Sequence, residues 1–95
     1  MPSMTKKKAL SLLQKTSKQG NKLTSLSPFG EVEQWSKDAR VNVPAIFGPD
    51  SPEATESIKL LDLLDREQTP VGRMMRKLAV LNVLKELQTK VAGWE

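Results

Sequence analysis

The chain has 95 residues, a formal charge of +4 from 15 basic and 11 acidic residues, and no cysteine, histidine or tyrosine. These absences exclude disulfides, thiolate and imidazole metal ligands, and every nucleophile that depends on a histidine base. A chain of this length forms one domain at most. We therefore expect a protein that is not an enzyme and has no catalytic residues, metal, cofactor or small-molecule substrate.

The positive charge is concentrated at the start of the chain. Residues 1–30 contain six lysines and no acidic residue, whereas residues 31–95 contain nine basic and eleven acidic residues. A basic segment on a nearly neutral body is typical of proteins that contact nucleic acid, an acidic protein or an anionic membrane surface. The residues predicted to bind such a surface are Lys6, Lys7, Lys8, Lys15, Lys18 and Lys22.

No apolar run approaches the ~18 residues that cross a membrane. The apolar residues after the first lysines are also too few for a secretory signal. The sequence therefore predicts an intracellular protein, cytoplasmic or nuclear, that is at most peripheral to a membrane.

Residues 5–18 are predicted to form a basic amphipathic helix with Thr5 as its N-cap. Ala9 and Leu13 lie on one side of this helix, and most of the lysines lie on the other. Two interpretations of this helix stay open. Its leucines dock on the rest of the protein, or the helix is a mobile arm that lies on an anionic membrane or phosphate backbone.

Glycine, asparagine, serine and threonine residues over 19–27 predict a linker. Residues 1–26 would then be a basic arm with its linker, and residues 27–95 a compact helical domain.

Ser27-Pro28 is an N-cap followed by proline, which predicts a short helix near 28–37. Pro44 and the Gly-Pro-Asp turn after it predict an extended crossing over 40–50.

Ser51-Pro52 and Thr69-Pro70 repeat the cap-and-proline pattern at the start of two apolar-periodic segments. They predict helices at about 52–66 and 70–92, and the short link between them predicts an antiparallel helical hairpin. The predicted fold class is all-α, a small helical domain.

The helix at 70–92 is apolar around most of its circumference, with Val71, Leu78 and Leu81 among the residues assigned to its inner face. Such a helix needs neighbours on more than one side. We expect the excess of leucine and methionine to drive self-association or binding of a protein partner. The candidate interaction residues are Trp35, Leu60, Leu63, Met74, Met75, Leu84, Leu87 and Trp94.

Arg73, Arg76 and Lys77 form a basic cluster directly after the tight turn at 67–69. Helix–turn–helix proteins place basic residues at this point of a recognition helix, so a nucleic-acid-binding regulator is the alternative function. A solvated basic face, or ion pairs with the acidic residues of the preceding helix, would explain the same cluster. The leading prediction is a non-enzymatic interaction or adaptor protein, a type common among small accessory proteins of viruses and phages.

Overall fold

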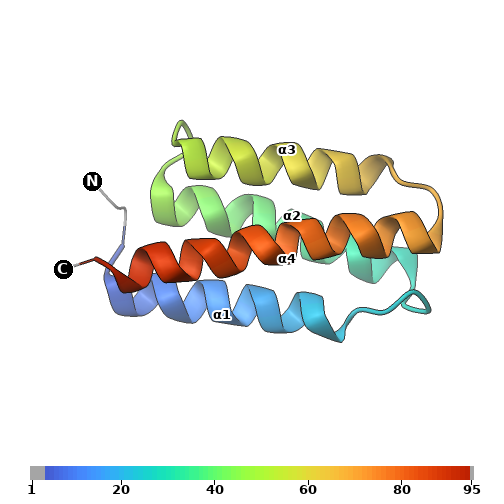
Figure 1. The fold of residues 1–95 in the computed structure, drawn as a ribbon, viewed down its shortest axis with the longest axis horizontal. Coiled ribbons are helices and arrows are strands. Elements are labelled where there is room, and N and C mark those ends of the chain that lie inside the picture. Colours follow the sequence, from blue (N-terminus) through green and yellow to red (C-terminus); the bar gives the residue numbers. More distant parts are fainter. Residues whose placement is uncertain (1–3, 95) are drawn as a thin grey trace.

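The computed structural model describes residues 4–94, which form four helices: α1 (Lys6–Lys22), α2 (Phe29–Phe47), α3 (Pro52–Arg66) and α4 (Pro70–Ala92). Successive helices run in opposite directions (Figure 1). α1 packs against α2 and α4, and α3 packs against the same two helices, so each helix lies at one corner of a four-helix bundle. The predicted all-α class is confirmed.

Side-chain caps start three of the four helices. The hydroxyl groups of Thr5, Ser51 and Thr69 accept hydrogen bonds from backbone N–H groups three residues ahead, at 3.3, 3.1 and 3.0 Å. Each bond satisfies one of the donors that a helix start leaves unpaired. The bounds of α3 and α4 are those predicted for the C-terminal hairpin.

The Ser27-Pro28 cap does not form as predicted. Pro28 itself is the N-cap of α2, and the helix begins at Phe29. The Ser27 hydroxyl instead accepts a hydrogen bond of 2.8 Å from the Thr24 backbone N–H, which closes the loop that precedes the helix.

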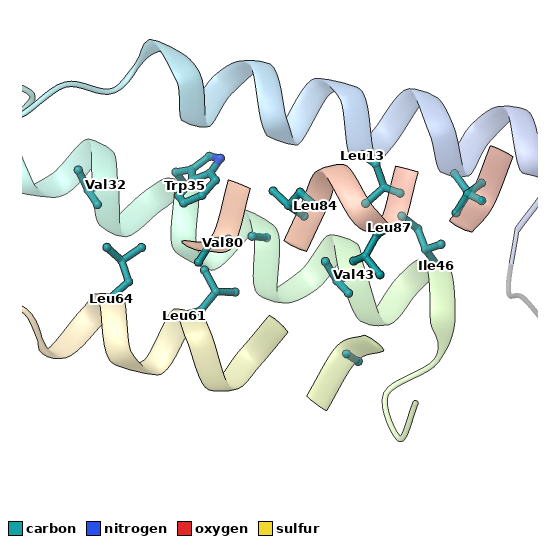
Figure 2. Packing of buried hydrophobic residues seen from close by; sticks show 14 residues of the cluster. Leu13, Val32, Trp35, Val43, Ile46, Leu61, Leu64, Val80, Leu84 and Leu87 are labelled. Atoms are coloured by element: carbon teal, nitrogen blue, oxygen red, sulfur yellow. The ribbon is translucent and has the colours of Figure 1, made fainter. Parts of the chain in front are cut away.

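The predicted extended crossing at 40–50 is wrong, because α2 is one helix through Phe47. Pro44 lies inside it, where a proline costs about 3 kcal/mol. Val43 and Ile46 on either side are fully buried (Figure 2). Burying each contributes about 1.5–3 kcal/mol, which offsets the cost of the proline.

The predicted linker also begins too early. α1 continues through Gly20 to Lys22, and Gly20 is buried where α1 lies against the Trp35 ring of α2. Of the two readings left open for the first helix, the docked one is observed: Ala9 and Leu13 are fully buried in the same core as the other helices.

The core runs the length of the bundle and receives side chains from all four helices (Figure 2). Its large members include Leu13 from α1, Ile46 from α2, Leu61 from α3 and Leu84 from α4. The apolar set that is buried is Ala9, Leu13, Val32, Trp35, Ala39, Val43, Ile46, Ala54, Leu61, Leu64, Val80, Leu84, Leu87 and Val91.

Candidate anion-binding surface

Five of the six lysines of α1 lie along one side of the helix, on the outside of the bundle. Ala9, Leu13, Thr16 and Gly20 are the buried residues of this helix. At 100° per residue, five lysines project from the opposite side, and all of them are exposed. We call these residues the α1 lysine stripe: Lys7, Lys8, Lys15, Lys18 and Lys22. Lys6 is also exposed, but it lies nearer the inner face.

Within residues 4–94, no carboxylate forms a salt bridge with a lysine of the stripe. α1 contains no acidic residue. The salt bridges of the described chain involve Arg40, Arg76 and Lys90, and none involves a lysine of α1. Two acidic side chains line a shallow groove of about 310 Å³ between α1 and α2, where Glu31 and Asp38 lie on the α2 side and Lys22 on the α1 side.

The outer face of α1 offers charge with little apolar surface. Leu13 is fully buried, and Leu10 and Leu12 are half-buried against the core. The helix has no aromatic residue, and none of the large exposed apolar side chains of the described chain comes from it. The stripe can therefore bind a ligand mainly by electrostatic attraction.

The basic cluster at the start of α4 is not displayed as a group. The Arg73 Nε donates to the Glu67 carbonyl at 2.8 Å, and its guanidinium lies over the Phe29 ring. The Arg76 guanidinium pairs with the Glu67 carboxylate at 3.0 Å. Lys77 is only 6% exposed and donates to the Leu23 carbonyl. All three side chains are thus engaged within the bundle.

Two carboxylates of α3 form ion pairs with an arginine of α2 and not with the basic cluster of α4. The Arg40 guanidinium of α2 contacts both Asp62 and Asp65 at 2.6 Å. Burial by itself lowers the pKa of Arg40, but the hydrogen bonds to Asp65 and Asp62 outweigh burial and raise it above the ordinary value. These two ion pairs link α2 to α3.

Most of the predicted interaction residues face inward. Trp35, Leu84 and Leu87 are buried in the core, while Leu60, Leu63, Met74 and Trp94 are half-buried. The Trp94 ring packs edge-on against Phe47, with 5.8 Å between centroids. Of the eight candidates, only Met75 is largely exposed.

Met75 belongs to an exposed apolar row on the first turns of α4. Val71, Met75 and Leu78 are 69%, 67% and 57% exposed. Their i, i+4, i+7 spacing places them on one side of the helix. We call them the α4 apolar stripe. Val71 and Leu78 were predicted to face the core and are exposed instead, because the inner face passes through Lys77 and Val80.

No three carboxylates of residues 4–94 are grouped so as to hold a metal ion. No helix among these residues is long and apolar enough to cross a membrane.

Comparison with protein-family models, curated proteins and solved structures finds nothing that matches this chain. The described residues present two distinctive surfaces, the α1 lysine stripe and the α4 apolar stripe.

Proposed function

We propose that this protein is a non-enzymatic interaction protein that docks on an anionic surface through the α1 lysine stripe. The observation that carries the proposal is the division of α1 into a buried apolar face and an exposed face of lysines. Folding places the leucines in the core and leaves the lysines in solvent. The basic surface is therefore a fixed property of the folded protein.

The electrostatics support the same function. A row of like charges costs stability through repulsion, and opposite charges on neighbouring helices would relieve that cost. Among residues 4–94, the four salt bridges lie elsewhere in the bundle. An external anion would supply the ion-pair partners that these lysines lack within the bundle.

Chromatography on immobilised heparin, a polyanion, tests the proposal. The test variant is Lys8→Gln/Lys15→Gln/Lys18→Gln. The control is Lys37→Gln/Lys59→Gln/Lys85→Gln, which removes the same charge from exposed lysines of the other three helices. We expect the stripe variant to elute at clearly lower salt than the parent and the control to elute close to the parent. Equal elution of the two variants would contradict the proposal.

We propose that a second copy of the same chain covers the α4 apolar stripe. Three exposed apolar side chains on one helix face form a self-complementary row. In an antiparallel pairing centred on Met75, Val71 of one copy lies opposite Leu78 of the other. Such an isologous contact buries the same patch on both subunits, as two-fold dimers require.

Analytical ultracentrifugation of the whole chain tests this contact. We expect the parent to dimerise and Met75→Glu to stay monomeric, because a carboxylate at the centre of the contact would be buried without a partner. The control Val41→Glu changes a side chain that is 68% exposed on α2, away from the stripe, and leaves the dimer intact. A parent that remains monomeric at high concentration would overturn the proposed dimer.

A further inference from the structure

We infer that the α1 lysine stripe binds the phosphate backbone of a nucleic-acid duplex and does not read its base sequence. The inference rests on the proposed function, since it specifies which anionic surface the stripe engages. Three features of the structure carry it: the buried apolar face of α1, the row of lysines on an ordered helix, and the absence of arginine from that row.

The leucines argue against a membrane as the ligand. Helices that lie on a bilayer insert their apolar face among the lipid chains and leave the cationic face outward. In this bundle Ala9 and Leu13 are fully buried, and the Trp35 ring packs against α1 at Gly20. Turning that face towards lipid would remove α1 from the core. The surface left for binding is charged but not apolar, which suits a polymer of phosphates better than a bilayer.

The geometry of the stripe suits a duplex. Lys7 and Lys22 are separated by about 22 Å along the helix axis, at 1.5 Å per residue. This length exceeds the ~12 Å width of the major groove of B-DNA, so the row can reach phosphates on both edges of the groove. Because α1 is packed against α2 and α4, the backbone that carries the lysines is already ordered before binding.

The chemistry of the row favours backbone contacts over base contacts. A lysine ammonium is a compact point charge that pairs with phosphates, whereas arginine has the planar fork that recognises guanine. α1 contains six lysines and no arginine. Binding should therefore depend little on base sequence.

The aromatic residues argue against single strands. Proteins that bind single-stranded nucleic acid stack bases on exposed aromatic rings beside a basic groove. α1 has no aromatic side chain. Trp35 is buried beneath it, Trp94 packs against Phe47, and the half-exposed Phe29 ring is covered on one face by the Arg73 guanidinium. A duplex, whose bases are already stacked, does not need such rings.

The experiment is fluorescence anisotropy of a labelled 30-base-pair DNA duplex titrated with the whole protein between 50 and 200 mM NaCl. Each lysine–phosphate contact contributes about −0.9 to the slope of log K against log salt. Five contacts predict a slope of about −4.5, and hence a loss of about 500-fold over this range. The same titration is repeated with a second duplex of unrelated sequence, an RNA duplex and a single strand.

We expect Lys8→Gln/Lys15→Gln/Lys18→Gln to make the slope shallower by about 2.7, at about 0.9 for each lysine removed. It should also bind at least tenfold more weakly at 100 mM salt. The control Lys37→Gln/Lys59→Gln/Lys85→Gln should change the slope by no more than about 0.9, which is the contribution of one contact. Circular dichroism checks that both variants retain the helical fold.

The other outcomes separate this inference from the proposed function. Binding to phosphatidylserine vesicles or to polyglutamate, but not to duplexes, would overturn the inference and leave the anionic-surface function in place. Binding to none of these polyanions would overturn both. A preference of more than tenfold for one duplex sequence, or for the single strand, would also overturn the inference. Comparable binding of DNA and RNA duplexes would support recognition of the shared phosphate backbone.

Discussion

The indole Nε1 of Trp35 donates a hydrogen bond of 2.8 Å to the backbone carbonyl of Thr16. This bond links α2 to α1 in the buried interior, where both residues are at most 3% exposed. The Thr16 hydroxyl accepts a second bond of 3.1 Å from the Asn42 side chain of α2. α1, the helix that carries the lysine stripe, is thus held by polar contacts as well as by its leucines.

Trp35→Phe is expected to lower the free energy of unfolding by about 2 kcal/mol. The smaller ring removes apolar contacts and leaves a cavity, and the lost N–H deprives the Thr16 carbonyl of one donor. Urea denaturation followed by circular dichroism measures the change. A loss below about 0.5 kcal/mol would show that neither the bond nor the ring matters for docking α1.

Gly20→Ala tests how closely α1 approaches α2. A Cβ atom at this position would lie 2.6 Å from Cζ2 of Trp35 and 2.9 Å from Cδ2 of Leu81. The Trp35 ring is buried and hydrogen-bonded, so it cannot move aside at low cost. Overpacking of this kind costs about 1–3 kcal/mol, which exceeds the gain of about 1 kcal/mol in helix propensity. We expect a net loss of stability in thermal denaturation.

The matched control for this substitution is Gly30→Ala. Gly30 lies in the first turn of α2, and nothing lies within 4 Å of the position its Cβ would take. The alanine should therefore leave stability unchanged or raise it by up to about 1 kcal/mol. If both substitutions stabilise the protein equally, then α1 does not approach the Trp35 ring closely at Gly20.

The bounds of α3 and α4 can be predicted from the sequence because their signals are local. Ser51 and Thr69 are good N-caps, each is followed by proline, and a regular apolar pattern begins directly after it. The lengths of α1 and α2 cannot be predicted in this way. Gly20 and Pro44 are local signals for a break, and the contacts that override them come from other helices.

Which face of α4 points to the core cannot be predicted from the local sequence pattern either. Apolar residues occur all around this helix, so several faces fit the i, i+3, i+4 rule. In the bundle Lys77 faces inward and Leu78 outward, the reverse of what polarity suggests. The lysine stripe of α1 was predictable because its lysines and leucines lie on opposite sides of one helix.

Ser57→Ala is expected to stabilise the protein. Ser57 is 2% exposed, and its hydroxyl has no hydrogen-bond partner among residues 4–94. Alanine removes the unpaired buried group and has the higher helix propensity, so we expect a gain of about 0.5–1.5 kcal/mol. In a domain of this size, that gain raises Tm by several degrees, which differential scanning calorimetry can measure.

Ser36→Ala provides the comparison for this prediction. Ser36 is as deeply buried, at 1% exposed, but its hydroxyl donates to the Asp65 carboxylate at 3.3 Å. Removing a bonded hydroxyl should be neutral or destabilising. A lower Tm for Ser57→Ala than for Ser36→Ala would contradict the assignment of the unpaired group.

Lys77 is the buried charge of α4. Its ammonium donates to the Leu23 carbonyl at the C-terminal end of α1, and no carboxylate in residues 4–94 pairs with it. Burial disfavours the charged form and lowers the pKa of Lys77 below its ordinary value. Between the folded and the unfolded pKa, the unfolded chain binds more protons. This group therefore makes the free energy of unfolding rise with pH across that interval.

Lys77→Met should remove both the buried charge and this pH dependence. Methionine fills a similar volume, so we expect the variant to match or exceed the stability of the parent at pH 7, by up to about 1 kcal/mol. That advantage should shrink as the pH rises towards the ordinary pKa of lysine, because the parent then buries a neutral amine. Urea denaturation at pH 7 and pH 9.5 measures the difference, with Lys85→Met, an exposed lysine of the same helix, as control. If the stability advantage of Lys77→Met grows with pH, the pKa of Lys77 is not lowered. If Lys77→Met is much less stable than the parent at pH 7, the bond to Leu23 outweighs the cost of burying the charge.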